Sequence, residues 1–354
     1  MRLDVAVIAL ETGAAMSRVL DDLLGTEAWP QHVRDSVNER RFDGRWTMWV
    51  VAAHHRGELI GAMPVSGCRG GSIPDANLRA EFERRAPASL GRIDARQLMF
   101  LGGHAWLCGG VSLGPKAPKQ DAVAVAEALV GAGMRLAGAR RRIPVALFVP
   151  DHQLAPVTGA WRPPLMTTEA PSRAFLPVPP GSGIDAYLAA LRRGPRQHWR
   201  DDLRRLERAR IRADPVPVSD DLLMEAAPAI AHVKTRHGLF DHPRITEMRL
   251  RAWHRDVDPT VTRAWTVRDS AASLLGVSIG VVRNGVLTMV EIGLVEAHPF
   301  RRDFYLELAF HAPLRTCLSE SLTGIDLGSG HPVPKLWRGA VLRRQWHVFA
   351  ASVA

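Results

Sequence analysis

Hydrophobic and polar residues alternate in similar ways in the two halves of the chain. In the first half, residues 46–53 and 59–65 are apolar runs of strand length that flank a short turn, which predicts a hairpin. Residues 122–141 have apolar positions at helical spacing and predict an amphipathic helix. Residues 1–45 are polar, with helical spacing over 16–24 and a charged stretch over 31–41, and we expect them to be helical.

The second half repeats this order of elements. A long basic helix is expected over residues 185–212, and Asn284 and Gly285 mark a tight turn between two apolar runs. An Asn-Gly pair in that position is the strongest short signal for a hairpin. We expect the later elements at residues 262–268, 274–282 and 286–294 (strands), 303–321 (helix), and 325–328 and 345–352 (strands).

Prolines and glycines separate the two halves. Their density predicts a linker over residues 166–184, between a first domain at 1–165 and a second domain at 185–354. The repeated order of helices, strands and turns predicts an α+β (mixed α/β) protein. We expect two tandem domains, each a mostly antiparallel sheet flanked by helices.

The charge of the chain is strongly positive. Lys and Arg number 46 against 36 Asp and Glu, and the formal net charge of +10 at pH 7 attracts polyanions. Only four of the basic residues are lysines. An arginine-rich composition is also what a GC-rich genome produces, so the charge has two explanations at this point.

Other features of the composition exclude several classes of protein. Three cysteines far apart in the sequence provide neither a disulfide framework nor paired zinc ligands, and we expect no metal site. No run approaches 18 consecutive apolar residues and no secretory signal opens the chain, so we expect a cytoplasmic protein that does not act at a membrane. The chain has no phosphate-binding Gly-Lys-Ser/Thr loop, no nucleophile elbow and no dinucleotide motif.

Two segments of the second half resemble the FemAB-like and BioF2-like branch of the GNAT-like acyltransferase superfamily. One is the basic helix at residues 187–206, and the other runs from Ile325 to Gly339. The turn phrases at residues 56–62 and 272–277, each with a glycine in the second strand, are similar to the hairpin of the superfamily. The resemblance implies two tandem GNAT-like domains and an acyltransferase activity.

The resemblance also implies an acyl donor. The branch includes Fem-type ligases that take their acyl group from aminoacyl-tRNA, which would make charged tRNA a partner and leave no bound cofactor. GNAT-like enzymes that use acyl-CoA bind its pyrophosphate on a glycine-rich loop at a helix N-terminus. The corresponding loop here, residues 296–305, has no glycine, and its counterpart at 113–119 contains two prolines, which lack N–H donors. These loops disfavour acyl-CoA without excluding it.

The basic helix is the candidate surface for tRNA. Nine arginines lie among residues 192–212, against three acidic residues. The excess predicts contacts with the RNA backbone, and the alternative is a solvated helix face with i,i+4 ion pairs. The candidate tRNA-binding residues are Arg192, Arg193, Arg196, Arg200, Arg204 and Arg208.

Lys335 and Glu291 are the candidate catalytic residues. The resemblance implies that Lys335, in a predicted loop, contacts the acceptor end of the donor or stabilises the transition state; the alternative is an ordinary surface lysine. Glu291 lies in the middle of a predicted strand, where GNAT-like enzymes often place a carboxylate. A buried Glu with a raised pKa could take the proton of an amine nucleophile, whereas an outward-facing Glu would have no such role.

Five further residues are candidates for substrate binding. Arg338 shares the argument for Lys335, Trp337 flanks the same segment, and Tyr305 lies near the start of a predicted helix. Lys234 and His237 lie in a predicted joint of the second domain, where an acceptor could bind. An ordinary core or surface position is the alternative for each of the five.

These features together predict an enzyme that transfers an aminoacyl group from aminoacyl-tRNA to a small-molecule amine or hydroxyl acceptor. The product is an amide or an ester, as in natural-product and antibiotic biosynthesis. The donor ester is already activated, so orientation and charge stabilisation suffice and no covalent enzyme intermediate is needed. The alternatives are an acyl-CoA-dependent N-acyltransferase and a non-catalytic RNA-binding protein on a GNAT-like scaffold.

Overall fold

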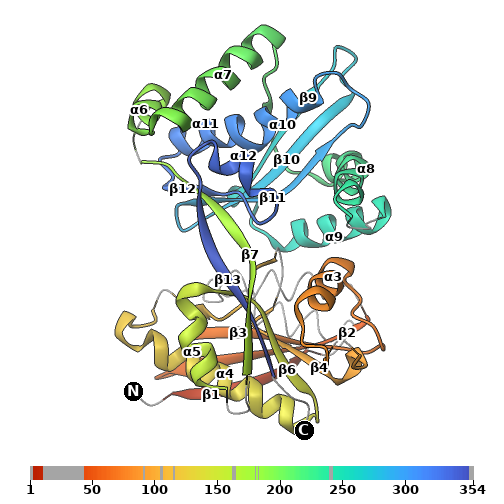
Figure 1. Cartoon of the computed structure of the whole chain (residues 1–354), viewed down its shortest axis with the longest axis vertical. Helices are drawn as coiled ribbons and strands as arrows, with labels where there is room; N and C mark the ends of the chain where they lie inside the picture. Colours follow the sequence, from red (N-terminus) through yellow and green to blue (C-terminus); the bar gives the residue numbers. More distant parts are fainter. Residues whose placement is uncertain are drawn as a thin grey trace. The chain divides into compact units, whose positions relative to one another are not determined.

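The computed structural model describes residues 3–10, 44–90, 92–103, 107–114, 116–161, 165–179, 181, 183–238 and 242–350. The helices expected over residues 16–24 and 31–41 lie outside these ranges. The chain divides into two compact units: unit 1 comprises residues 1–171 and 344–354, and unit 2 comprises residues 172–343. The elements are labelled in Figure 1.

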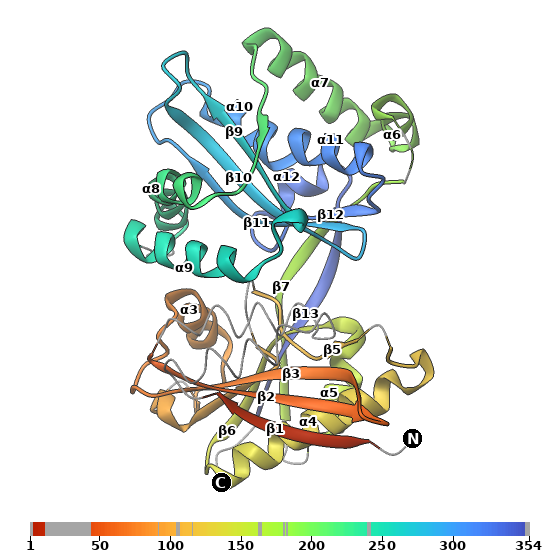
Figure 2. The same ribbon diagram turned by 180° about the vertical axis from the view of Figure 1, so that it is seen from behind.

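Unit 1 is built on strands in the order β1-β2-β3-β4-β6-β13, of which β1, β2 and β3 lie side by side in Figure 2. β1 pairs antiparallel with β2, so the first described residues form a strand and not the expected helix. β2 and β3 form the predicted hairpin, and β4 and β6 run parallel and are connected through α4. The elements of unit 1 are β1 (Asp4–Leu10), β2 (Trp46–His55), β3 (Glu58–Cys68), α3 (Ala76–Arg85), β4 (Leu98–Leu101), β5 (Ser112–Leu113), α4 (Ala122–Ala139), β6 (Ile143–Pro150) and α5 (Leu154–Gly159).

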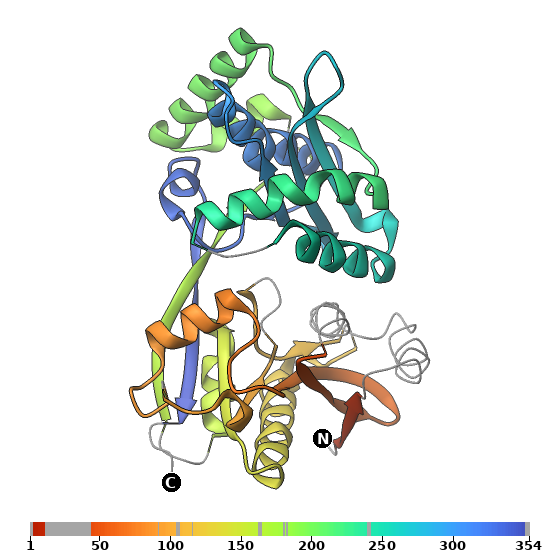
Figure 3. The same cartoon turned by 90° about the vertical axis from the view of Figure 1, so that its right-hand side faces the viewer.

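Unit 2 has the strand order β7-β12-β11-β10-β9-β8. The elements within it are α6 (Ile184–Ala190), α7 (Arg193–Ala209), β8 (Asp214–Val216), α8 (Asp220–Arg236), α9 (Pro243–Asp256), β9 (Thr262–Arg268), β10 (Leu274–Arg283), β11 (Val286–Leu294), α10 (Arg301–Leu306), a π-helical segment (Glu307–His311), α11 (Ala312–Ser319), β12 (Gly324–Asp326) and α12 (Pro332–Leu336). α8 packs on β10 and β11 and on α9, and the continuous helix formed by α10, the π-helical segment and α11 also packs on these strands (Figure 3). Asn284 and Gly285 have φ values of 49° and 73°, as the predicted tight turn requires.

A glycine in the second strand of each hairpin lets a helix approach the sheet. A Cβ at Gly61 in β3 would lie 2.9 Å from Cγ1 of Val125 in α4. A Cβ at Gly276 in β10 would lie 2.7 Å from Cδ1 of Leu308 in the π-helical segment. Both distances are too short for a real Cβ, so each position requires glycine. The glycine of the repeated turn phrase therefore has the same packing role in both units.

Two strands pass from one unit into the other. β7 (Leu165–Pro177) and β13 (Val341–Ala350) are neighbours in the strand order, and the unit boundary falls within each. A strand therefore occupies most of the segment 166–184 that was expected to be a linker, and residues 344–350 belong to unit 1 instead of the second domain. Proline fixes φ at a value that extended chain also adopts, so a proline-rich segment can pair wherever its missing N–H is not needed.

α4 is the one helix among the described residues that is long and apolar enough to cross a membrane. Its residues Val125, Leu129 and Val130 are buried in the hydrophobic core of unit 1. The packing is that of a helix on a sheet.

Candidate active site in unit 2

Glu291 lies in β11 next to a β-bulge. The pairing of β11 with β10 shifts by one residue between Met289 and Glu291, which leaves Val290 as the extra residue. The residues of β11 that pack on the core of unit 2 are Leu287 and Met289 before the bulge and Ile292 and Leu294 after it. The extra residue thus turns Glu291 to the opposite face of the sheet, where α8 packs.

Glu291 is buried there between two cations. Its Oε1 accepts hydrogen bonds from Nζ of Lys234 in α8 and from Nη2 of Arg249 in α9, each at 2.6 Å. Burial alone would raise the pKa of Glu291, but Lys234 and Arg249 outweigh it and hold the pKa below its usual value. The expected direction of the pKa shift is therefore wrong, and Glu291 is a weaker base than the sequence indicated.

β11 and β12 separate close to this ion pair. They run parallel only from Val286 opposite Gly324 to Thr288 opposite Asp326, the last residue of β12. Glu291 therefore lies beyond the paired stretch, and the chain that follows β12 leads to α12.

Lys335 is buried in α12 with 7% of its surface exposed, and so differs from the expected loop lysine. Its Nζ donates hydrogen bonds to the backbone oxygens of Leu327 (2.8 Å), Gly328 (3.0 Å) and Ser329 (3.3 Å). An ammonium group has three N–H donors, and all three are used. In this structure Lys335 holds the loop after β12 and does not present its charge to a substrate.

The surroundings of Lys335 disfavour its charged form. Burial first, and then the nearby Arg173, lower the pKa of Lys335 to about 8, while Asp326 acts in the opposite direction. Arg173 and Asp326 form an ion pair of their own, with Nε of the arginine 2.9 Å from Oδ2 of the aspartate. These two residues, which the sequence analysis did not single out, tie β7 to the end of β12.

Arg338 is fully engaged inside the protein. Its Nε lies 2.8 Å and its Nη2 2.6 Å from Oδ2 of Asp202 in α7, and its guanidinium lies 4.5 Å from the ring centroid of Phe310. Nε1 of Trp199 donates to the backbone oxygen of Arg338 at 2.9 Å. These contacts fasten the segment after α12 to α7, so a direct role of the Arg338 side chain in substrate binding would require them to break. The sequence analysis did not single out Asp202. Its spacing from Trp199 could have indicated it, because both residues lie on the buried face of α7.

The two aromatic candidates have different environments. Tyr305 is half-buried, and its ring stands edge-on to Phe310 with centroids 5.8 Å apart. Burial raises the pKa of Tyr305, and Arg338 opposes this shift. Trp337 is 51% exposed and stacks on His198 of α7 with ring centroids 5.4 Å apart. Trp337 therefore has open ring surface beside α7.

His237 lies between the candidate residue on α8, Lys234, and the candidate residue on α12, Lys335. It follows α8, which carries Lys234, and its Nδ1 lies 2.9 Å from Nε2 of His331. His331 is the N-cap of α12, which carries Lys335, and has a left-handed φ of 40°. The sequence analysis missed His331, because no local pattern marks a histidine that caps so short a helix.

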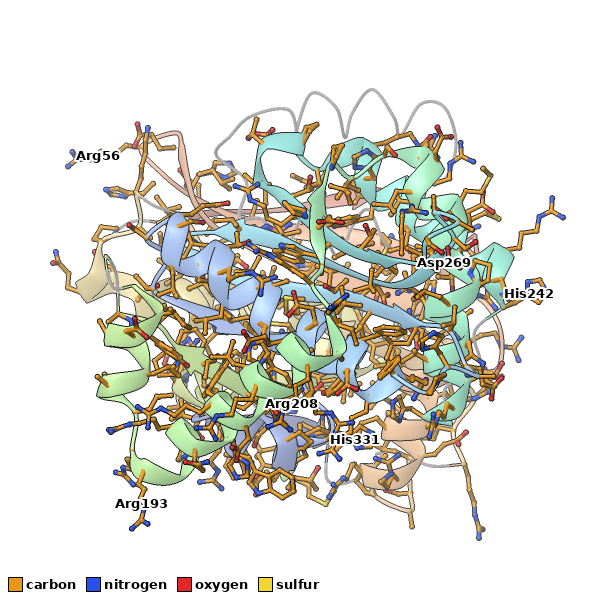
Figure 4. The ribbon with its side chains drawn as sticks, turned by 90° about the horizontal axis from the view of Figure 1, so that it is seen from above. Arg56, Arg193, Arg208, His242, Asp269 and His331 are labelled. Atoms are coloured by element: carbon orange, nitrogen blue, oxygen red, sulfur yellow. The ribbon has the colours of Figure 1, made fainter. Side chains whose placement is uncertain are left out.

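Four of the six candidate tRNA-binding arginines share one face of α7. Arg193, Arg200, Arg204 and Arg208 recur at intervals of seven, four and four residues, and all are exposed. We call these four residues the arginine face, and the outward direction of Arg193 can be followed in Figure 4. Within the described part of the chain, only Arg204 of the four has an ion-pair partner, Asp201 at 3.5 Å.

The remaining two arginines differ. Arg196 is half-buried and donates hydrogen bonds to the backbone oxygens of Ala189 (2.9 Å) and Leu191 (2.7 Å). It therefore stabilises the end of α6 instead of facing a partner. Arg192 is the exposed N-cap of α7.

Metal ligands do not cluster in the residues that the structure describes: no group of three or more His, Cys, Asp or Glu side chains could hold an ion. The chemistry available in unit 2 is that of ionised side chains and backbone groups. Such groups can orient a nucleophile and stabilise developing charge.

Solved structures of low sequence identity align with this chain over most of its length. L-PGS from Bacillus licheniformis aligns with a TM-score of 0.58 at 9% identity, over 98% of this chain and 95% of that one. FemX aligns with a TM-score of 0.57 at 10% identity, over 89% of this chain and 90% of that one. The C-terminal DUF2156 domain described for a lysylphosphatidylglycerol synthetase from Agrobacterium fabrum aligns with a TM-score of 0.54 at 12% identity, over 94% and 90%.

The chain has the GNAT-like fold of FemX. The predicted mixed α+β fold class and the resemblance to the FemAB-like branch are thereby confirmed at the level of the fold. No protein-family profile and no curated protein sequence matches the chain.

Proposed function

We propose that the protein transfers an aminoacyl group from aminoacyl-tRNA to the amine or hydroxyl of a small-molecule acceptor. The observation that carries the proposal is the arginine face of α7, which lies in the same unit as the buried charged residues around Glu291 and Lys335. The fold shared with FemX and L-PGS supports it, because the FemAB-like branch that the sequence resembles includes enzymes that use charged tRNA.

The arginine face suits a nucleic-acid backbone. From Arg193 to Arg208 it extends on the order of 22 Å along the helix, long enough for several consecutive phosphates. Three of its four guanidinium groups have no ion-pair partner among the described residues, so their charge is available to an external anion. The opposite face of α7 packs into the core through Trp199 and Leu206, which fixes the direction of the arginines.

The buried groups fit a reaction without a covalent enzyme intermediate. In the proposed reaction the acceptor attacks the ester carbonyl, the new amide or ester bond forms, and the bond to the terminal ribose of the tRNA breaks. The acceptor loses a proton and the ribose oxygen gains one. Glu291, kept ionised by Lys234 and Arg249, can accept a hydrogen bond from the acceptor, and Lys335 acts by positioning the loop after β12.

Transfer itself tests the proposal. The purified protein is incubated with a pool of radiolabelled aminoacyl-tRNAs and a small-molecule fraction of a cell extract. We expect label to appear in a small product that resists ribonuclease. Transfer from acetyl-CoA in place of charged tRNA would establish the acyl-CoA alternative, and RNA binding without transfer from either donor would establish the non-catalytic one.

Charge reversal tests the arginine face. The double variant Arg200→Glu/Arg204→Glu should weaken tRNA binding at least tenfold and make the slope of log K against log salt shallower by about two. The matched control is Arg79→Glu/Arg135→Glu, which makes the same charge change at exposed positions of unit 1. Equal losses in the two double variants would show that only net charge matters and would remove the arginine face from the proposal.

A further inference from the structure

Four basic side chains from three separate elements converge near the start of α12. Arg236 and His237 lie at the end of α8, Arg301 begins α10, and His331 caps α12. The rings of His237 and His331 have centroids 4.4 Å apart, and their facing nitrogens are 2.9 Å apart. We call these four residues the basic cluster.

Each charge in the basic cluster works against the others. Burial, then His331, Arg236 and Arg301, lower the pKa of His237. Burial and Arg236 likewise lower the pKa of Arg301. Groups of like charge at this range destabilise one another unless a counter-charge is present.

The described residues supply little counter-charge. Glu296 is the acid that acts on Arg301, but it is 72% exposed and also lies 3.5 Å from Nε2 of His232. Nε of Arg301 is buried without a hydrogen-bond partner in the described part of the chain. Asp303, two residues along α10, is paired with Arg205. The basic cluster therefore holds unused donors and uncompensated positive charge.

The backbone beside the basic cluster is open. Gly328 and Gly330 have φ values of 69° and 82°, and a Cβ on either would meet no atom within 4 Å. Lys335 binds three carbonyl oxygens of this loop and so fixes the segment that presents His331. The basic cluster is thus held in place by a buried group and has room beside it.

We propose that Arg236, His237, Arg301 and His331 form a binding site for a phosphate ester whose affinity rises as the pH falls. The two arginines supply permanent charge and planar donors that match a phosphate oxygen edge. A hydrogen bond between two imidazoles requires a neutral acceptor ring, so the free site keeps at least one histidine unprotonated. A bound anion makes protonation of both rings more favourable, and protonation in turn strengthens its binding.

Two ligands carry phosphate groups that this site could bind. One is the phosphodiester backbone at the 3′ end of a charged tRNA, and the other is the pyrophosphate of coenzyme A. The assignment to a donor rests on the proposed function, whereas the existence of the anion site does not.

Sulfate is the probe for the site itself, because it keeps both negative charges between pH 5.5 and 7.5. Calorimetric titration of the whole protein at constant ionic strength should show saturable binding that tightens about tenfold from pH 7.5 to 5.5. Arg236→Gln/Arg301→Gln should weaken sulfate at least tenfold, whereas the control Arg79→Gln/Arg135→Gln in unit 1 should not. Unchanged affinity in the first double variant, or no saturable binding, would overturn the site.

The pH dependence of sulfate binding tests the role of the two histidines separately. His237→Asn/His331→Asn keeps the two arginines and should still bind sulfate at pH 7.5, with the gain at pH 5.5 lost. Circular dichroism of each variant without sulfate verifies that it is folded. A retained pH dependence in the folded His237→Asn/His331→Asn variant would overturn the role of the histidine pair.

Competition against sulfate distinguishes the sources of phosphate. Displacement by the trinucleotide cytidyl-cytidyl-adenosine and not by coenzyme A supports the tRNA donor. Displacement by coenzyme A alone supports the phosphate site and counts against the proposed function, so the two can fail separately. Displacement by neither would overturn the assignment to a phosphate ester.

Discussion

The two units share a scaffold but bury charge to different extents. Among the described residues, the buried acidic and basic side chains of unit 1 are Glu81 and His347, with Oε1 and Nε2 3.2 Å apart. Those of unit 2 are Arg173, Asp202, Glu291, Asp303, Glu307, His311, Lys335 and Arg338. Burying a charge costs free energy even when the charge is paired. Unit 1 nevertheless forms a comparable sheet with helices and has almost no buried charges. The scaffold that the two units share therefore does not by itself explain the buried charges of unit 2.

The pair in unit 1 has a structural explanation. The backbone N–H of Phe148 donates to Nδ1 of His347 at 3.2 Å, so Nε2 of His347 carries the proton that faces Glu81. Phe148 has a left-handed φ of 55° at the place where the β6–β13 pairing shifts. The histidine thus holds an irregular strand in place, whereas the ions around Glu291 and Lys335 hold one another and a loop.

The largest expected effect comes from breaking the ion pair of Glu291. Glu291→Gln leaves Lys234 and Arg249 facing a neutral amide in a buried place, and should lower the free energy of unfolding by about 3 kcal/mol. Glu81→Gln in unit 1 weakens the hydrogen bond with His347 and the ion pairs with the exposed Arg84 and Arg85, and should cost about 1–2 kcal/mol. Urea unfolding of both variants measures the difference.

A rescue variant separates charge from packing at Glu291. Replacing all three residues, as Glu291→Leu/Lys234→Met/Arg249→Met, should recover most of the lost stability. It should not support transfer, because the carboxylate that receives the hydrogen bond of the acceptor is gone. Equal destabilisation by Glu291→Gln and Glu81→Gln would instead show that the two units do not differ in the cost of their buried charge.

An intermediate effect is expected for Lys335. Lys335→Met leaves three backbone oxygens without their donor, so the free energy of unfolding should fall by about 1–3 kcal/mol. Displacement of the loop after β12 should lower the rate of transfer on the order of 10²-fold, while the contribution of the arginine face to tRNA affinity stays unchanged. Lys116→Met in unit 1, where the lysine side chain is 64% exposed, should alter neither quantity. A transfer rate within about threefold of the wild type would contradict the positioning role.

The most gradual expected effect is a dependence of stability on pH. The pKa of Lys335 is lowered to about 8 in the folded protein, below the ordinary lysine value of 10.5 that applies to the unfolded chain. Between these values the unfolded chain binds the proton and the folded protein does not, so stability rises with pH from about 8 to 10.5. The difference in unfolding free energy between the wild type and Lys335→Met should therefore grow over this range in favour of the wild type. A constant difference would mean that the lysine titrates normally.

Local signals in the sequence determined much of the fold. The hairpin β2–β3, the turn at Asn284 and Gly285, and the basic helix depend on residues close together in the chain. The hairpin and the turn are confirmed by the structure. The basic helix is confirmed over Arg193–Ala209, whereas the start of the expected range forms the separate helix α6 and residues 210–212 are not helical. Gly61 and Gly276 were recognisable as a repeated position because both hairpins face the same packing constraint. Periodicity and turn chemistry suffice for such elements, since their hydrogen bonds and side-chain neighbours are local.

Only the tertiary structure decided which charged residues are buried. One extra residue in β11 turns Glu291 toward Lys234 and Arg249, and nothing in the alternation of that strand marks the bulge. Lys335 can be buried because three carbonyl oxygens of a folded loop accept hydrogen bonds from its ammonium group. The proline-rich β7 is a strand because β12 and β13 pair with it. These outcomes depend on partners distant in sequence, whose contribution to the electrostatic and hydrogen-bonding balance exists only once the chain has folded.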